Sequence, residues 1–125
     1  MPYRAPLTDF GFILDHVVGY AQVSGTQLFA EATADTVSAV LAEAGKLAEN
    51  TLAPLNRAGD KQPARLENGI VRTSPGFAEG YRAIADGGWV GMAANPDFGG
   101  MGLPMTVTTC VNDMMGSACL ALQLN

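Results

Sequence analysis

Few side chains in this sequence can carry out covalent chemistry, and none of them stands in a recognisable catalytic pattern. His16 is the single histidine, and Ser24 and Ser38 are candidate hydroxyl nucleophiles. Neither serine stands in the Gly-x-Ser-x-Gly turn that exposes a nucleophile, and one histidine does not make a hydrolytic triad by itself. We therefore predict no catalytic residue here and expect His16 to be a partly buried helix residue with one hydrogen-bond partner.

Metal ligands are also too few and too scattered in this sequence. A zinc site needs several ligands at defined spacing, which one histidine with Cys110 and Cys119 does not supply. If both cysteines lie on one helix, they occupy opposite faces about 13 Å apart along its axis, whereas a disulfide needs Cα atoms within about 7 Å. Two reduced thiols are therefore expected, as is typical of a cytoplasmic protein.

The most distinctive stretch is a glycine-dense segment at residues 87–91 and 95–104. It reads Gly-Gly-Trp-Val-Gly and then Asn-Pro-Asp-Phe-Gly-Gly-Met-Gly-Leu-Pro. It matches neither the Gly-x-Gly-x-x-Gly dinucleotide fingerprint nor the Gly-Lys-Ser/Thr of a P-loop, so phosphate binding is disfavoured. We expect a tight surface loop whose glycines allow positive φ angles and close backbone approach, with Trp89 and Phe98 anchoring it.

The segments that must position this loop have helical periodicity. A first helix is predicted to begin at Thr8 or Asp9 as N-cap and to end at Gly19. Its apolar stripe consists of Phe10, Ile13, Leu14 and Val17. Residues 22–32 have no clear period and are expected to be loop with one helical turn.

A second helix carries the strongest periodicity. Thr33 is its expected N-cap, and Pro54 is expected either to end it or to kink it. Its buried stripe consists of Val37, Val40, Leu41, Ala44, Leu47 and Ala48. Residues 56–61 are then expected to form a polar turn. Asn-Gly at 68–69 predicts a tight two-residue turn in a small hairpin over 64–72 that lies on the helices.

Two further helices are predicted around the glycine-dense segment. The third begins near Ser74 with Pro75 at its first position, and Gly87 and Gly88 stop it. Its apolar edge consists of Phe77, Tyr81 and Ile84. The fourth runs from Pro104 to the chain end, and one face consists of Val107, Val111, Met114, Ala118 and Ala121. The predicted fold class is therefore all-α, a helical bundle with at most one small β-hairpin.

Composition limits the partners. The chain has 125 residues, of which 48% are hydrophobic and 15% charged, so one globular domain over residues 1–125 is expected. A net charge of −5 with scattered basic residues disfavours nucleic acid. The first residues do not form a secretory signal, and no apolar stretch approaches the roughly 20 residues of a membrane span.

The order of several short motifs resembles the N-terminal helical domain of acyl-CoA dehydrogenases. The glycine-dense segment matches that family's Gly-Trp, Pro-Glu and Gly-Gly-x-Gly-Leu-Pro pattern, and similar motifs stand at residues 53–57, 59–60 and 68–71. The opening residues 3–14 look like the N-terminal extension of the 3-methylmercaptopropionyl-CoA dehydrogenase branch. The resemblance extends over nearly the whole chain.

The resemblance implies the function of a parent enzyme. Acyl-CoA dehydrogenases oxidise the α–β bond of an acyl-CoA thioester, pass a hydride to FAD and use a carboxylate base. The family's flavin-binding β-domain and C-terminal catalytic domain have no counterpart before Asn125, so we expect a truncated domain that is inactive alone and does not retain FAD. The parent is expected to bind acyl-CoA and to form a homo-oligomer in the cytoplasm.

The resemblance also suggests which residues lie near the acyl chain. Asn112, Asp113, Gly116 and Cys119 are the candidates for substrate binding, because the matching helix of the family lines the acyl pocket. Asn112 and Asp113 depart from the consecutive acidic residues of many members, and Asp97 replaces a common glutamate. No catalytic, metal-binding or specific flavin-binding residue is assigned. The alternative is a stand-alone helical module that binds an apolar partner or acyl chain through a methionine-rich face.

Overall fold

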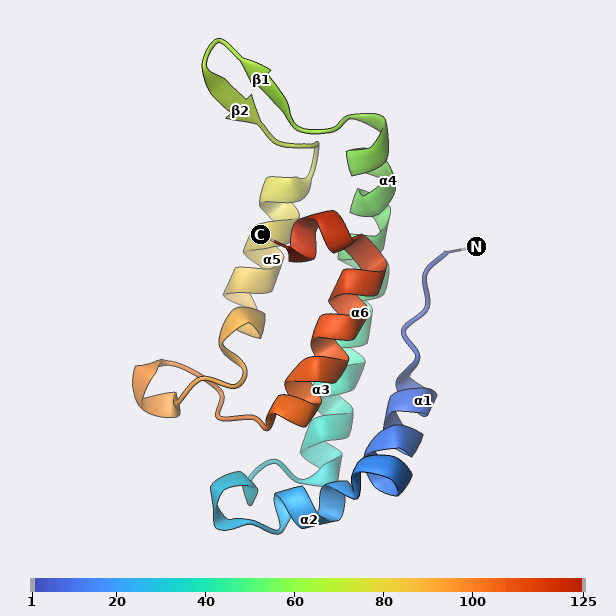
Figure 1. Ribbon diagram of the computed structural model, residues 1–125, viewed down its shortest axis with the longest axis vertical. Helices are drawn as coiled ribbons and strands as arrows, with labels where there is room; N and C mark the ends of the chain where they lie inside the picture. The colour runs from blue at the N-terminus through green and yellow to red at the C-terminus, as the bar shows by residue number, and fades with distance from the viewer. Residues whose placement is uncertain (1, 125) are drawn as a thin grey trace.

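The computed structural model describes residues 2–124, and it is a helical bundle with one small hairpin (Figure 1). The predicted fold class is confirmed. The α-helices are α1 (Leu7–Phe12), α2 (Tyr20–Ser24), α3 (Ala34–Leu47), α4 (Ala53–Lys61), α5 (Phe77–Asp86) and α6 (Met105–Gln123). The strands are β1 (Arg65–Glu67) and β2 (Ile70–Arg72). Short 3₁₀ segments are η2 (Gln27–Phe29), η4 (Trp89–Gly91) and η5 (Pro96–Phe98), and wider π-helical segments are η1 (Ile13–Val18) and η3 (Ala48–Leu52). Met1 and Asn125 lie outside the described residues, so the predicted continuation of the last helix to Asn125 does too.

A long helical rod formed by α3, η3 and α4 is the axis of the bundle (Figure 1). Thr33 caps it as predicted, because its hydroxyl accepts a hydrogen bond of 3.2 Å from the amide of Thr36. Pro54 does not end the rod. It follows the π-helical turn and stands at the beginning of α4, where a missing amide hydrogen disturbs least. The predicted polar turn at 56–61 is therefore wrong, since these residues continue the helix.

Helix α6 packs along this rod and supplies much of the core. Val107, Val111 and Met114 are fully buried, as the predicted face requires. The prediction is wrong at Ala121, which is exposed, whereas Leu122 is buried. The physical reason is a kink at Cys119, whose φ of −156° and ψ of 84° are not helical and rotate the last turn.

The N-terminal helix differs more from its prediction. It begins after Pro6 rather than after Thr8 or Asp9, and it widens into the π-helix η1 before ending at Gly19, as predicted. Phe10 and Leu14 are buried, but Ile13 and Val17 are 42% and 72% exposed, because the wider turn moves them off the stripe. The expected loop with one turn at 22–32 contains the end of α2 and η2.

His16 also lies elsewhere than predicted. Its side chain is exposed, and its ring lies against Phe12 with centroids 4.8 Å apart. The expected partly buried histidine with a hydrogen-bond partner is therefore wrong. Leu14 is the buried residue of η1, and Asp15 and Val17 beside His16 are exposed as well.

The hairpin forms where predicted but stands away from the helices (Figure 1). Its strands pair antiparallel with Leu66 opposite Val71, and Asn68 and Gly69 have the positive φ angles of a type I′ turn. All six strand residues are exposed, so the prediction that the hairpin lies on the helices is wrong.

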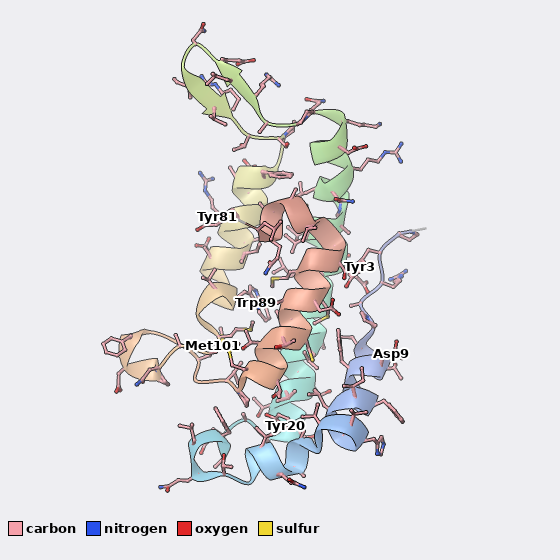
Figure 2. The ribbon with its side chains drawn as sticks, in the orientation of Figure 1. Tyr3, Asp9, Tyr20, Tyr81, Trp89 and Met101 are labelled. Carbon is pink, nitrogen blue, oxygen red and sulfur yellow. The ribbon has the colours of Figure 1, made fainter. Side chains whose placement is uncertain are left out.

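Helix α5 begins later than predicted and presents a different edge. Gly76, not Ser74, is its N-cap, and Ser74 is buried beside the bundle. Tyr81, predicted on the apolar edge, is 51% exposed, whereas Ile84 is buried (Figure 2 labels Tyr81). Gly87 and Gly88 follow the last helical residue, as predicted.

Candidate functional site

The glycine-dense segment between α5 and α6 is a closed loop held by its own backbone. The amides of Met101, Gly102 and Leu103 donate to the carbonyls of Gly91, Ala94 and Met92 at 3.1, 3.0 and 2.8 Å. The amide of Gly100 donates to Asn95 at 3.1 Å. Four successive amides thus have partners inside the loop, so they do not form a cradle for the pyrophosphate of a dinucleotide.

Close backbone approach explains the glycines of this loop. A Cβ at Gly100 would lie 2.0 Å from the carbonyl oxygen of Ala94, which no side chain tolerates. Gly99 has a φ of 83°. The predicted tight glycine-dependent loop is confirmed.

Of the two predicted anchors, only Trp89 holds the loop to the bundle. Its ring is partly buried and packs on the core between α5 and α6 (Figure 2). Phe98 is 88% exposed, so the prediction that it anchors the loop is wrong. It lies in η5, a short turn whose backbone bonds hold it without the help of its ring.

Three of the four predicted substrate-binding residues lie together on the outer face of α6. Asn112, Asp113 and Gly116 border a shallow, open depression of about 490 Å³. Its other lining residues are Ser117, Leu120, Gln123 and Leu124. The side-chain amide of Gln123 donates to the side-chain Oδ1 of Asn112 at 3.3 Å across this depression. The face combines polar groups at one end with exposed leucines at the other.

The fourth candidate, Cys119, is separated from this face. It is fully buried at the kink of α6, while Cys110 is buried on the same helix, and both are free thiols. Burial, with a smaller contribution from the Asp113 carboxylate, raises the pKa of the Cys110 thiol. That thiol therefore stays protonated and a poor nucleophile at neutral pH.

Asp113 also borders a second groove, which lies between α6 and the segment formed by α1 and η1. The groove measures about 420 Å³, and its lining is mostly apolar, with Phe10, Leu14 and Val18 on one side and Thr106 on the other. The hydroxyl of Thr106 is buried without a hydrogen-bond partner. Asp113 thus lines both this groove and the depression beside Asn112 and Gly116.

Tyr3, from the N-terminal segment, lies beside this same edge (Figure 2). Its hydroxyl is buried without a partner. Burial first, and then the carboxylates of Asp113 and Glu49, raise the pKa of Tyr3. The phenol therefore stays protonated at neutral pH.

A third depression, of about 170 Å³, adjoins the first across Asn112. It lies between α5 and α6, and Trp89 and Met115 form part of its wall with Gln123. Sequence reasoning missed Leu120 and Gln123. The i, i+4 spacing of 112, 116 and 120 signals the leucine, and Gln123, about three turns after Asn112, falls on the same side of a regular helix. In a straight helix the two residues would lie about 16 Å apart along the axis, and the kink at Cys119 brings their side chains within hydrogen-bond distance.

The described residues hold no metal cluster. Within 2–124, no three His, Cys, Asp or Glu side chains are placed to share an ion. In the same part of the chain, every helix is too short or too polar to cross a lipid bilayer. Among the described residues of α6, no activated nucleophile and no paired acid and base lie on this face.

The chain is similar in sequence to two acyl-CoA dehydrogenases. The chain is 35% identical over 124 residues to a 3-methylmercaptopropionyl-CoA dehydrogenase of Ruegeria pomeroyi, covering 99% of this chain and 21% of that protein. It is 27% identical over 113 residues to a broad-specificity linear acyl-CoA dehydrogenase of Mycobacterium tuberculosis, covering 89% of this chain and 18% of that protein. No family model matches the chain. The expected resemblance to acyl-CoA dehydrogenases is confirmed, and the chain spans about a fifth of the length of these curated relatives.

Proposed function

Because this chain is related in sequence to acyl-CoA dehydrogenases over nearly its whole length, we propose that it is the N-terminal helical domain of such an enzyme, occupying residues 1–125. The observation that carries the proposal is the 35% identity to a 3-methylmercaptopropionyl-CoA dehydrogenase across 99% of the chain. The parent would oxidise an acyl-CoA thioester, and this domain would contribute part of the acyl-binding surface. The absence of an activated nucleophile or acid–base pair among the described residues supports a binding role.

The proposed acyl-binding surface is the outer face of α6. Asn112, Asp113 and Gly116 would contact the acyl chain or its thioester end, with Leu120 providing apolar contact. Gly116 supports this most directly. A Cβ there would have no neighbour closer than 3.8 Å, so the fold of this chain does not itself require glycine in mid-helix. A ligand or covering domain close to the helix supplies a reason for it. Cys119 would act only indirectly, by shaping the kink.

Flavin chemistry would come from the rest of the enzyme. The amides of residues 100–103 are already satisfied within the loop, so they are not free to bind the flavin pyrophosphate. The domain alone would be inactive and would not retain FAD. We further propose that the parent works in the cytoplasm as a homo-oligomer, without a nucleic-acid partner, in keeping with the net charge of −5.

A hybrid enzyme tests the proposal. The chain replaces the matching segment of the Ruegeria pomeroyi relative, and acyl-CoA-dependent reduction of an electron-accepting dye is measured. We expect an active flavoprotein hybrid, whereas the 125-residue chain incubated with FAD and desalted keeps no flavin colour. A hybrid that folds and binds FAD without activity, or stoichiometric flavin on the isolated chain, would contradict the domain assignment and favour a stand-alone binding module.

A pair of leucine substitutions in the hybrid tests the surface. Gly116→Leu places bulk in the proposed acyl-binding face and should lower kcat/KM for acyl-CoA by about tenfold, equivalent to roughly 1.4 kcal/mol. Ala39→Leu adds the same side chain at an exposed position of α3 and should leave kcat/KM unchanged. Flavin content is measured in both. Equal effects of the two substitutions would remove Gly116 from the binding surface.

A further inference from the structure

The β-hairpin is a sheet without neighbours. In the part of the chain that the structure describes, β1 and β2 form a sheet of two strands only, which stands beyond the ends of α4 and α5 (Figure 1). Leu66 and Val71 are 72% and 64% exposed. Two strands alone are marginally stable in water, and unpaired strand edges are templates for further strands.

The backbone of β1 offers one residue for such pairing. Glu67 and Ile70 flank the two-residue turn and therefore form the hydrogen-bonded pair nearest to it. Because the pattern alternates along a strand, the amide and carbonyl of Leu66 point away from β2, toward the open edge. A second β1 strand placed antiparallel, with Leu66 opposite its own copy, would satisfy both groups on each chain.

The charge order of β1 suits this arrangement. Around a two-fold axis through Leu66, Arg65 of one copy stands opposite Glu67 of the other, and the reverse pair is equivalent. The open edge of β2 lacks this property, because the same operation about Val71 would place Ile70 opposite Arg72. Within one chain Glu67 already contacts Arg65 and, at 3.9 Å, Arg72, so the carboxylate lies among these cations.

We propose that the open edge of β1 pairs with the same edge of a second copy of this chain, giving a four-stranded antiparallel sheet. One face of that sheet carries a continuous apolar row of Val71, Leu66, Leu66 of the second copy and Val71 of the second copy. The other face carries the crossed Arg65–Glu67 pairs. Because each strand is only three residues long, association is weak and concentration-dependent. The proposal is independent of the dehydrogenase assignment.

Charge exchange tests the pairing in the 125-residue chain. Sedimentation velocity over concentrations up to about 1 mM should show a monomer–dimer equilibrium. Arg65→Glu and Glu67→Arg each place like charges opposite one another at two symmetric positions and should weaken dimerisation about fivefold to tenfold. The double variant Arg65→Glu/Glu67→Arg restores opposite charges and should restore dimerisation. Far-UV circular dichroism checks that each variant keeps the helical fold. We expect no loss of helix, because all residues of the two strands are exposed and do not pack on the bundle.

Cysteine substitution gives a second readout that identifies the edge. Leu66→Cys should form an intermolecular disulfide on oxidation, because hydrogen-bonded antiparallel partners have Cα atoms about 5.5 Å apart. Val71→Cys is the matched control on the same face, and it should not crosslink, since both β1 strands separate it from its copy. Both native thiols are buried. A monomeric wild-type chain at all concentrations, a double variant that stays as weak as the single ones, or crosslinking through Val71→Cys would each overturn the proposal.

Discussion

Three glycines show how single residues connect this sequence to its fold and to its surface. A Cβ at Gly59 would lie 2.9 Å from the ring of Phe77, and one at Gly100 would lie 2.0 Å from a backbone oxygen. Both belong to motifs that resemble acyl-CoA dehydrogenases, and packing within this chain accounts for both. Gly116 is different, because a Cβ there would make only ordinary van der Waals contacts, none closer than 3.8 Å. The absence of a side chain at Gly116 would therefore allow a ligand or another domain to approach α6 closely.

Alanine substitutions should separate these two kinds of glycine. Gly100→Ala forces the loop apart and should destabilise the chain by about 2 kcal/mol or more. Gly116→Ala should stabilise it by roughly 0.5–1 kcal/mol, because alanine favours the helix and meets no close neighbour. Urea unfolding followed by circular dichroism measures both. A destabilised Gly116→Ala chain would show that the fold itself requires glycine there.

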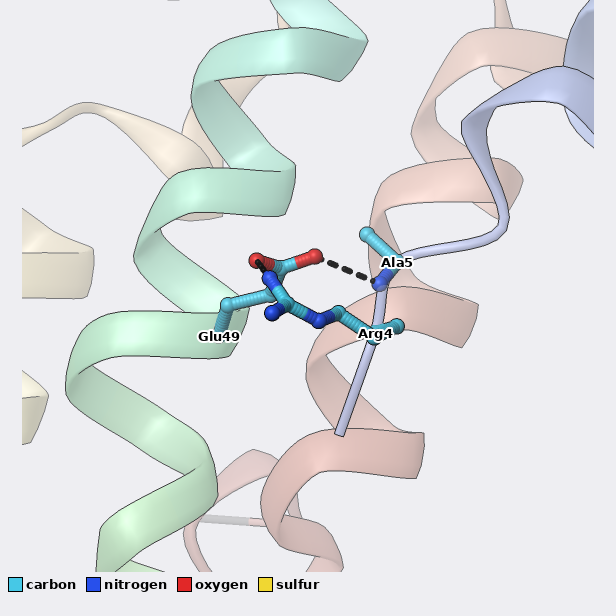
Figure 3. A network of polar contacts seen from close by, with 3 residues as sticks. All are labelled: Arg4, Ala5 and Glu49. Atoms are coloured by element: carbon cyan, nitrogen blue, oxygen red, sulfur yellow. Dashed lines mark hydrogen bonds and ion pairs between the residues drawn. The ribbon is translucent and has the colours of Figure 1, made fainter. Parts of the chain in front are cut away.

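At the scale of elements, a single carboxylate ties the N-terminal segment to the central rod. Glu49, in the π-helical turn η3, accepts a hydrogen bond of 2.9 Å from the Ala5 amide and one of 3.2 Å from Arg4 (Figure 3). Gly45 on the preceding turn allows this approach, since a Cβ there would already lie 3.1 Å from Ala5. The segment that leads into α1 is thus positioned before α1 begins.

The two hydrogen bonds of Glu49 should contribute unequally. Glu49→Ala removes the acceptor of a charge-assisted backbone bond and should cost about 1–2 kcal/mol. Arg4→Ala should cost less than about 0.5 kcal/mol, because the Arg4 side chain is 78% exposed and water screens its ion pair. Chemical denaturation of both variants tests this order. Equal losses would mean that the ion pair, and not the backbone bond, holds the segment.

The molecule as a whole keeps several weakly acidic groups protonated. Burial raises the pKa of Tyr20, whose hydroxyl donates to the Ala32 carbonyl at 2.7 Å. Burial, aided by Asp113, raises the pKa of Tyr3 and of the Cys110 thiol as well. In each case the folded-state pKa lies above the unfolded one. The contribution of these groups to the free energy of unfolding is therefore fully present at a pH below their unfolded-state pKa values. It is lost as the pH rises through their folded-state pKa values.

Thermal unfolding should show this directly. Tm should stay level up to about pH 9, near the unfolded value of the Cys110 thiol, and fall increasingly above pH 10, the value for tyrosine. Tyr3→Phe should leave Tm almost unchanged at neutral pH, because the removed hydroxyl has no hydrogen-bond partner, and should make the alkaline decline shallower. A Tyr3→Phe chain whose decline is as steep as that of the wild type would exclude Tyr3 as a contributor.

Sequence alone determined the features that depend on neighbours along the chain. Thr33 caps α3 because its hydroxyl reaches an amide three residues later, and Asn68-Gly69 turns the hairpin because both residues accept positive φ. The loop at 87–104 followed from its glycines in the same way. The choice of Asn112, Asp113 and Gly116 came from the family resemblance, and it was the structure that placed the three residues beside one depression.

Only the tertiary structure decided where the period of a helix changes and what lies against it. Each of three irregularities shifts the helical register. The π-helical turn η1 leaves Val17 exposed, and the π-helical turn η3 precedes Pro54, after which the helix continues as α4. The kink at Cys119 places Leu122 in the core instead of Ala121. Such shifts are small in energy locally and are stabilised by packing between distant segments, so no local pattern reveals them. For the same reason, the direction of the hairpin and the burial of Cys119 were settled by the bundle and not by their own residues.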